Sequence, residues 1–269
     1  MQLLILLFTD DVLLLSYTPI GLQQQLNILS DTAKRLGLIV NMEKSKVIVF
    51  RKGGHLATRE KWLYNGENLE VVNQYKYLGV IFSTGLSFSY TLRDMACRAK
   101  KGVIGILRLL WSLGNQSPQM FFKLFDCQIQ PILTYGSEVW GLAADHTIIE
   151  RIHLFAIKRF LNVSIRTPNA LVYGETGRYR LYINVYVHSI KYWLTITRMH
   201  EDRIPRKSYK MLYNLHCINK NNWASAVCFT LYRHGFGFVW EHQGVADIKT
   251  FLVEFRQRLI DCYAQSWNN

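Results

Sequence analysis

Two adjacent carboxylates interrupt the apolar run with which the chain opens. Residues 3–8 and 12–16 are each about as long as a strand and almost wholly apolar, and Thr9, Asp10 and Asp11 lie between them. Aspartate favours turns, so the pattern predicts a hairpin whose strands are buried on both faces and whose turn carries both charges. Carboxylates at such a turn either face water or hold a cation, and oxygen ligands of this kind suit Mg²⁺.

The segments that follow predict a small α+β arrangement. Apolar residues at helical spacing follow Pro19 and stop at Gly37, which predicts one long helix. Asn65 and Gly66 lie between apolar segments, which is a strong signal for a hairpin. The predicted strands after the helix lie over residues 47–50, 62–64, 69–72 and 75–82. We therefore expect residues 1–83 to combine a small antiparallel sheet with a helix.

From Ser87 onward the spacing of apolar residues is mainly helical. The first predicted helix covers residues 92–113 and carries Arg98, Lys100 and Lys101 largely opposite its apolar residues. Such a face suits contacts with nucleic-acid phosphates, and the alternative is an ordinary solvated face. Further helices are predicted over residues 119–135, 145–161, 180–200, 205–216, 221–234 and 246–265.

A turn-rich segment, residues 164–177, divides this helical part into two regions, 84–163 and 164–269. Basic side chains alternate with tyrosine and tryptophan between residues 178 and 210. Exposed rings in such a pattern suit single-stranded nucleic acid, on which bases stack. Rings at helical spacing also form ordinary helical cores, and both interpretations remain open at this point.

The charge of the chain is uneven. The sequence has 32 Lys and Arg against 19 Asp and Glu, and residues 96–269 carry 22 of the cations but 11 of the acids. That excess suits a polyanionic partner, either nucleic acid or an acidic membrane surface, although a solubilising surface has the same composition. The opening apolar run has no preceding Lys or Arg and is interrupted by Asp10, unlike a signal peptide. Since no stretch approaches the ~20 uncharged residues of a membrane span, we expect an intracellular protein, nuclear or cytoplasmic, without a membrane partner.

The five cysteines do not form a recognisable metal or disulfide pattern. Their odd number and the lack of a Cys-x-x-Cys pair argue against a disulfide-stapled secreted module and a zinc ribbon. His216, Cys217, Cys228 and His234 are the nearest approach to a cluster of zinc ligands. The eleven-residue step between the two cysteines does not match a zinc knuckle, so packed thiols are expected instead.

Residues 8–16 resemble the aromatic-x-Asp-Asp motif of reverse transcriptases, and the likeness is greatest to those of non-LTR, LINE-type retrotransposons. Further segments follow in the order found in that family, at residues 21–23, 26–27, 37–41, 43–46, 47–50, 52–54 and 75–79. In the second half, residues 133–141, 170–179 and 222–224 are similar to segments of the same elements. One short motif is a weak signal, whereas several in order are a strong one.

The resemblance implies a partial right-hand polymerase fold. Residues 1–83 are expected to form the end of the palm with a primer-grip-like strand, 84–163 a helical thumb, and 164–269 a basic helical tail. Asp10 and Asp11 match the aspartates with which the family binds its two Mg²⁺ ions. Of the two, Asp10 is expected to be the more direct ligand.

The resemblance also implies contacts with nucleic acid. Lys46, or else Lys44, lies where the family often has a lysine near the incoming phosphates, and the alternative for both is a solvated turn. The other expected contacts are at Lys76, Tyr77, Gly79, Arg98, Lys100 and Lys101. The partners implied by the family are an RNA or DNA template–primer and a dNTP, whereas the oligomeric state is not indicated.

The resemblance is incomplete at the catalytic site. In the family, the fingers and an earlier palm strand with another metal-binding aspartate precede the aromatic-x-Asp-Asp motif, and here only seven residues precede Phe8. Two-metal chemistry needs carboxylates from two strands. We therefore expect a fragment of an RNA-directed DNA polymerase that is inactive alone and binds Mg²⁺ weakly. The alternative is a non-catalytic nucleic-acid-binding remnant that uses the basic thumb and tail, with vestigial aspartates.

Overall fold

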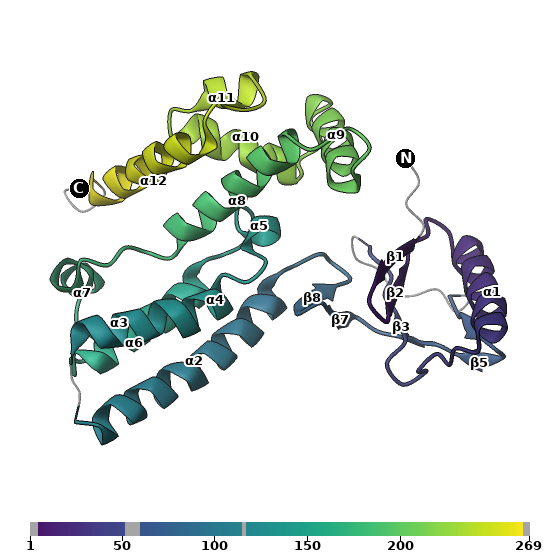
Figure 1. The fold of residues 1–269 in the computed structure, drawn as a ribbon, viewed down its shortest axis with the longest axis horizontal. Coiled ribbons are helices and arrows are strands. Elements are labelled where there is room, and N and C mark those ends of the chain that lie inside the picture. Colours follow the sequence, from purple (N-terminus) through teal and green to yellow (C-terminus); the bar gives the residue numbers. More distant parts are fainter. Residues whose placement is uncertain (1–4, 52–59, 115–116, 266–269) are drawn as a thin grey trace. The chain divides into compact units, whose positions relative to one another are not determined.

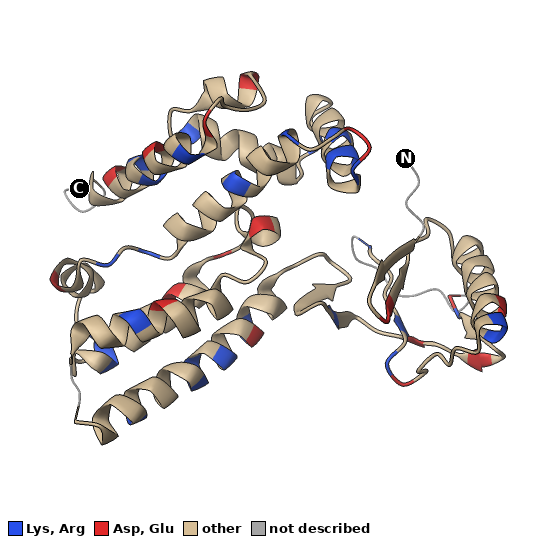
Figure 2. Cartoon of the chain, in the orientation of Figure 1, with Lys and Arg blue, Asp and Glu red and all other residues tan. Residues whose placement is uncertain are grey.

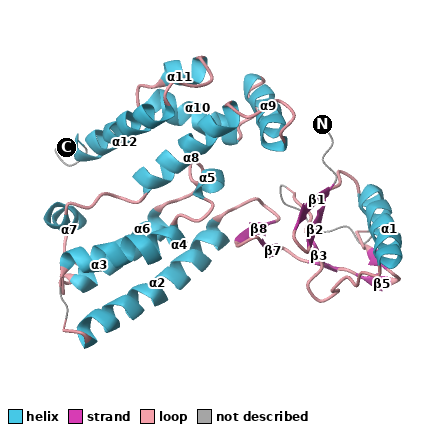
Figure 3. Ribbon diagram, in the orientation of Figure 1, coloured by secondary structure: helices cyan, strands magenta, loops and turns pink. Residues whose placement is uncertain are grey.

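A computed structural model describes residues 5–51, 60–114 and 117–265 of the chain (Figure 1). The chain divides into two compact units, Met1–Phe88 and Ser89–Asn269, and each is described by itself. Every strand in the described residues belongs to the first unit, whereas the second is helical (Figure 3). The structure is thus a mixture of helices and small strand pairs in which helices predominate, and it is compatible with the expected α+β class.

The first unit contains one long helix and four pairs of short strands. Its elements are β1 (Ile5–Phe8), β2 (Asp11–Leu14), α1 (Pro19–Leu36), β3 (Lys46–Val47), β4 (Leu63–Tyr64), β5 (Glu67–Asn68), β6 (Glu70–Val71), β7 (Gln74–Tyr77) and β8 (Val80–Ser83). The pairs β1–β2, β4–β5 and β7–β8 are antiparallel, and β3 pairs in parallel with β6. The described strands therefore pair two by two and do not form one continuous sheet.

Helix α1 begins and ends where the sequence predicts. Pro19 occupies its first turn, and the Thr18 hydroxyl accepts a hydrogen bond from a backbone N–H of that turn at 3.1 Å. Gly37 ends the helix with a φ of 67°, which glycine adopts without steric cost. The Gln23 amide then ties α1 to the next hairpin, because it bonds both the N–H (2.9 Å) and the carbonyl (2.8 Å) of Leu63. The buried core of this unit comprises Leu26, Val47, Trp62, Tyr64 and Leu69.

Strands β1 and β2 are far more exposed than their sequence predicts. The side chains of Leu7 and Phe8 are 69% and 54% exposed, and Val12 is exposed as well. Among the described strands, β1 pairs with β2 alone. Because an isolated two-stranded ribbon buries little surface, the expectation that both strands are buried on both faces is wrong for residues 5–14.

The strand expected over residues 75–82 is a hairpin. The chain reverses at Leu78 and Gly79, whose φ angles are 45° and 83°, and Tyr77 pairs with Val80. Two consecutive positive φ angles make the tight turn that matches the twist of a hairpin. The expectation of one continuous strand over residues 75–82 is therefore wrong, because the apolar pattern continues through the turn and conceals it.

The second unit consists of helices. They are α2 (Ser89–Ser112), α3 (Pro118–Leu124), the π-helix η1 (Phe125–Ile129), α4 (Gln130–Leu133), α5 (Ser137–Trp140), α6 (Thr147–Phe160), α7 (Asn169–Thr176), α8 (Tyr182–Thr197), α9 (Ile204–Cys217), α10 (Trp223–Arg233), α11 (Gly237–Glu241) and α12 (Ile248–Gln265). The predicted long helices are confirmed to within a few residues. The turn-rich segment differs from expectation, because it contains α7 between Pro168 and Gly177.

The helix expected over residues 119–135 is present but contains a π-helical turn. Ser117 caps it, and its hydroxyl accepts the Met120 N–H at 3.4 Å. Pro131 has no N–H with which to bond the carbonyl of Cys127 four residues earlier, so an α-helix is weakened at this point. The wider turn of η1 immediately before α4 accommodates that break.

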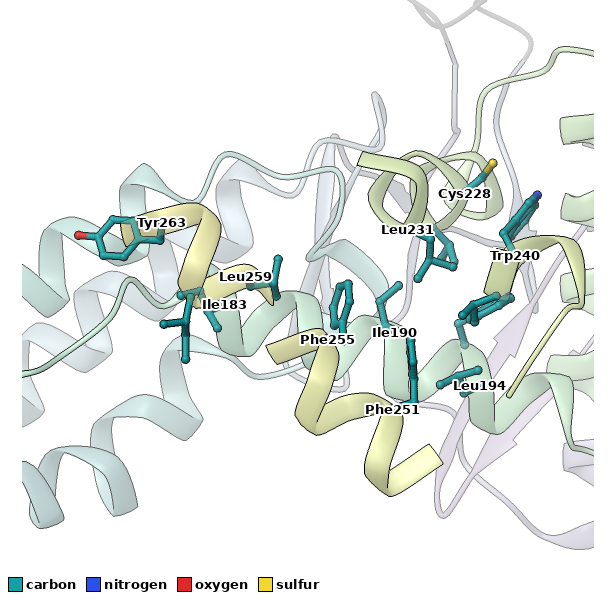
Figure 4. Packing of buried hydrophobic residues seen from close by; sticks show 14 of the residues in the cluster. Ile183, Ile190, Leu194, Cys228, Leu231, Trp240, Phe251, Phe255, Leu259 and Tyr263 are labelled. Carbon is teal, nitrogen blue, oxygen red and sulfur yellow. The ribbon is translucent and has the colours of Figure 1, made fainter. Parts of the chain in front are cut away.

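The core of the second unit is built around α8 (Figure 4). Trp193 is fully buried and stacks on Trp240 of α11, with ring centroids 5.7 Å apart. Phe255 and Leu259 of α12 and Leu231 of α10 complete the same cluster. Among the described residues, no helix is both long and apolar enough to cross a bilayer.

Candidate functional site

The paired aspartates lie at the turn of the β1–β2 hairpin. Phe8 pairs with Asp11, so Thr9 and Asp10 form a two-residue turn. Thr9 has a φ of 52°, and its hydroxyl lies 2.8 Å from Asp10 Oδ1. Both carboxylates are exposed. The predicted hairpin is confirmed, and its turn presents two adjacent carboxylates to water.

The pKa of the Asp10 carboxyl lies below its ordinary value. The hydrogen bond from Thr9 has the largest effect, the backbone N–H of Asp10 lowers the pKa further, and slight desolvation opposes them. The positive charge of Lys44 also lowers the pKa of Asp10. An aspartate with the ordinary pKa of 3.8 is already ionised at neutral pH, and these effects favour the ionised state further, which is the state that binds a hard cation.

The two candidate lysines are placed differently. Lys46 Nζ lies 2.6 Å from Glu70 Oε2, across the β3–β6 pair. Lys44 lies in a turn held at both ends, since its N–H donates to Asn41 Oδ1 at 3.0 Å and its carbonyl accepts the Tyr75 hydroxyl at 2.8 Å. Of the two lysines, Lys44 is the one whose charge acts on Asp10, whereas Lys46 is paired with Glu70.

Lys76, Tyr77 and Gly79 lie together at one end of the β7–β8 hairpin. Lys76 is exposed opposite Ile81, Tyr77 is partly buried, and Gly79 occupies the turn. Because residues 75–82 form a hairpin rather than a continuous strand, these residues lie at its turn. The sequence analysis, which expected a continuous strand, did not predict that position.

The three candidate basic residues of α2 do not all lie on one side of the helix. Arg98 and Lys101 are three residues apart and are therefore neighbours on the helix surface, whereas Lys100 projects from a different side than Arg98. Arg98 pairs with Asp94 at 3.0 Å, which offsets part of its charge. Lys100 and Lys101 are both exposed. Lysine and arginine outnumber acidic residues along this helix (Figure 2).

An aromatic ring on α6 lies beside Lys100 of α2. Lys100 Nζ lies 5.3 Å from the centre of the Phe155 ring, and the Arg159 guanidinium lies 5.7 Å from the same centre. Cations favour the face of an aromatic ring. We define the α2–α6 basic face as four residues: Lys100, Lys101, Phe155 and Arg159. Sequence spacing predicts neither Phe155 nor Arg159, because the contact joins two helices.

Several Lys and Arg side chains between residues 178 and 210 form ion pairs or hydrogen bonds with other groups of the protein. Arg178 makes a two-point ion pair with Asp126, one arm of which spans 2.8 Å, and also lies over the ring of Phe122. Trp193 and Tyr209, from the same alternating pattern, are buried. For these residues the interpretation as helical core is confirmed, and the pattern is not one continuous surface for single-stranded nucleic acid.

The described residues contain no group of three or more His, Cys, Asp or Glu side chains able to hold a metal ion. Of the zinc candidates, His216 Nδ1 lies 3.0 Å from the Ser225 hydroxyl, and Cys217 is exposed. Cys228 and His234 are buried, and burial raises the pKa of the Cys228 thiol.

The sequence did not predict the buried polar cluster that the second unit contains. Glu150 Oε1 lies 2.9 Å from His153 Nδ1 and accepts the Tyr173 hydroxyl, and Oε2 accepts the Leu181 N–H at 2.8 Å. Burial raises the pKa of the Glu150 carboxyl, but these hydrogen bonds and the charge of His153 outweigh it, so the pKa lies below its ordinary value. The cluster ties α6 to α7 and to the start of α8.

Comparison with known proteins finds relatives of one kind. The chain is 24% identical over 169 residues to the RNA-directed DNA polymerase from mobile element jockey of Drosophila funebris, which covers 61% of this chain and 18% of that protein. It is 32% identical over 85 residues to the retrovirus-related Pol polyprotein from type-1 retrotransposable element R2 of Bradysia coprophila, covering 29% and 10%. It is 27% identical over 111 residues to a protein in type-1 retrotransposable element R1DM of Drosophila melanogaster, covering 41% and 11%.

These alignments span less than a fifth of the length of each relative. No protein-family model matches the chain, and no solved structure matches it. The resemblance to non-LTR retrotransposon proteins that the motifs predict is nevertheless confirmed by three relatives of that kind.

Proposed function

The chain is related to the Pol proteins of non-LTR, LINE-type retrotransposons, and from this relationship we propose that residues 1–269 are part of an RNA-directed DNA polymerase that binds a template–primer. The observation that carries the proposal is the similarity to the jockey polymerase over 61% of this chain. In this proposal residues 1–83 end the palm, 84–163 form the thumb and 164–269 form a helical tail.

In the proposed palm, Asp10 and Asp11 would hold Mg²⁺. Their chemistry fits, because both present exposed carboxylate oxygens and the pKa of Asp10 is lowered. Bound Mg²⁺ supplies a Lewis acid for the primer 3′ hydroxyl and charge for the phosphates of a dNTP. Two carboxylates alone hold such an ion weakly, and the described residues contain no third ligand beside them.

In the proposed thumb, the α2–α6 basic face would contact the phosphates of the template–primer. Lys100 and Lys101 are exposed, and Lys100 and Arg159 both contact the ring of Phe155. Lys44 and the tip of β7–β8, with Lys76, Tyr77 and Gly79, are the proposed contacts in the palm. Phosphate contacts position a duplex without reading its sequence, so we propose binding without strong sequence preference.

Residues 1–269 are expected to bind an RNA–DNA template–primer with strong salt dependence and without extending it. Each phosphate contact releases about one counterion, so the logarithm of the association constant should fall steeply with the logarithm of salt concentration. A filter-binding titration over a salt series measures the slope, and a primer-extension assay with Mg²⁺ and dNTPs measures synthesis. Salt-insensitive binding would contradict the proposed thumb contacts. Extension that Asp10→Ala abolishes would demonstrate an active enzyme with a ligand from outside the aspartate pair.

Removal of the Asp10 carboxylate is expected to weaken Mg²⁺ binding but not to change template–primer affinity in the absence of metal. Asp10→Ala should leave template–primer affinity unchanged in EDTA, because Asp10 has no positive charge with which to hold phosphate. Calorimetry of the unaltered chain with Mg²⁺ should give weak binding that Asp10→Ala abolishes, and Glu67→Ala, at an exposed carboxylate of β5, is the matched control. Tight Mg²⁺ binding would reveal a further ligand.

A further inference from the structure

A hollow of about 650 Å³ opens on the second unit where the end of α8, helix α11 and the turn before α12 meet. Its lining is formed by Thr197, Arg198, Phe238, His242, Gln243, Gly244, Val245 and Ala246. Its volume lies within the range of roughly 300–1,000 Å³ typical of small-molecule sites. The residues lie outside the α2–α6 basic face and outside the palm residues discussed above.

Two rings in this lining are presented to solvent. Phe238 is 56% exposed although it lies on a helix whose neighbouring Val239 and Trp240 are buried. His242 is also exposed, and its Nδ1 lies 2.7 Å from the Phe238 carbonyl oxygen. Because a carbonyl only accepts, Nδ1 carries a proton in this bond, and Nε2 is the second hydrogen-bonding atom of the ring. The hollow is thus lined by two exposed aromatic rings, one of which also carries a second nitrogen for hydrogen bonding.

An arginine is fixed at the rim of the same hollow. Arg198 Nη2 donates to the carbonyl oxygens of Val245 and Ala246 at 2.7 Å and 2.5 Å. In the described part of the chain, its Nε and Nη1 atoms have no hydrogen-bond partner. A guanidinium held by one arm keeps its remaining donors in a fixed orientation, which suits the oxygens of a phosphate.

The acidic groups closest in sequence are engaged by their own elements. Asp247 caps α12, because its carboxylate accepts the Thr250 hydroxyl and the Lys249 N–H at 2.9 Å. Glu241 accepts the Tyr232 hydroxyl at 2.7 Å. Neither carboxylate lines the hollow, so the charge presented within it is the positive charge of Arg198.

We propose that Arg198, Phe238 and His242 form a site for one unpaired nucleotide of a single-stranded RNA or DNA segment. The base would stack on the exposed rings, and Arg198 would bind the adjoining phosphate. Aromatic stacking and cationic groove contacts are the means by which proteins hold single strands without reading sequence. The inference rests on the proposed nucleic-acid function, but it assigns single strands to residues that the template–primer proposal does not use.

The test uses the full chain and three probes: an octameric oligouridine, UMP, and a blunt RNA–DNA duplex. Phe238→Ala combined with His242→Ala is expected to weaken oligouridine binding about tenfold or more, since stacking on a ring makes such a contribution per base. Duplex affinity should not change. Phe229→Ala is the matched control, because Phe229 on α10 is 62% exposed and does not line the hollow.

Four results would decide the matter. Oligouridine affinity that stays within about twofold in the double variant, or that falls equally in Phe229→Ala, would overturn the site. UMP that binds as tightly as the oligomer would overturn a strand as its ligand in favour of a free nucleotide. Duplex binding with no oligouridine binding would overturn this inference alone. Ring-dependent oligouridine binding with no duplex binding would support it while overturning the template–primer proposal.

Discussion

Replacing Lys100 and Lys101 by glutamine is expected to weaken binding of an RNA–DNA template–primer by about 50-fold near 0.1 M salt. Both lysines are exposed on α2, and Lys100 lies beside Phe155 and Arg159. Each lost phosphate contact removes about one released counterion, so the slope of log affinity against log salt should also fall by about 2. Glutamine keeps the length and polarity of the surface, so the change isolates charge.

The control for net charge is Lys191→Gln combined with Lys220→Gln. Both lysines are exposed in the same unit, on α8 and after α9, and neither belongs to the α2–α6 basic face. The control should leave the salt slope nearly unchanged. Arg98→Gln is expected to have a smaller effect than either Lys100→Gln or Lys101→Gln, since Arg98 is already paired with Asp94. Equal losses in the test and control variants would mean that binding depends on overall charge rather than on α2.

The largest effect on stability is expected from Glu150→Gln, which should lower the free energy of unfolding of the second unit by about 3 kcal/mol. The Glu150 carboxylate is buried and accepts hydrogen bonds from Tyr173 and the Leu181 N–H, with His153 Nδ1 at 2.9 Å. An amide replaces one acceptor oxygen by a donor, so one of these groups loses its partner. Urea unfolding followed by far-UV circular dichroism measures the difference, and Glu254→Gln, exposed on α12, is the control.

The same carboxylate gives this difference a pH dependence. The pKa of Glu150 is lower in the folded chain than its ordinary value of 4.5. Its stabilising contribution is therefore complete above the ordinary pKa and is lost as the pH falls through the lower folded value. The gap in stability between the unaltered chain and Glu150→Gln should narrow as the pH falls below 4.5 and through the lower folded value. A gap that widens in acid would mean that Glu150 is protonated in the folded state.

The parts of the fold that were predictable depend on neighbours in sequence. Pro19 and Gly37 mark the two ends of α1, and Asn65 with Gly66 marks the β4–β5 turn, because each of these residues restricts its own backbone. The amphipathic pattern of α2 likewise predicts which of its side chains are buried. The turn at Leu78 could not be predicted in this way, because nothing in the leucine side chain favours a positive φ.

The candidate sites divide in the same way. The adjacency of Asp10 and Asp11 and their place at a turn follow from the sequence. The ion pair of Lys46 does not, because its partner Glu70 lies in a strand that only the fold pairs with β3. The Phe155 ring beside Lys100 and the hollow at Arg198 also join residues from separate helices, and no spacing along the chain signals such contacts.

By itself, then, the sequence determined most limits of the long helices, the place of two adjacent carboxylates at a hairpin turn and the relationship to non-LTR retrotransposon proteins. Local backbone preferences, periodic burial and short motifs are all written along the chain, so they can be identified without a structure. The tertiary structure decided which charges are paired, which aromatic rings are core and which side chains meet. Those outcomes depend on the distance between residues in space, and packing between helices sets that distance.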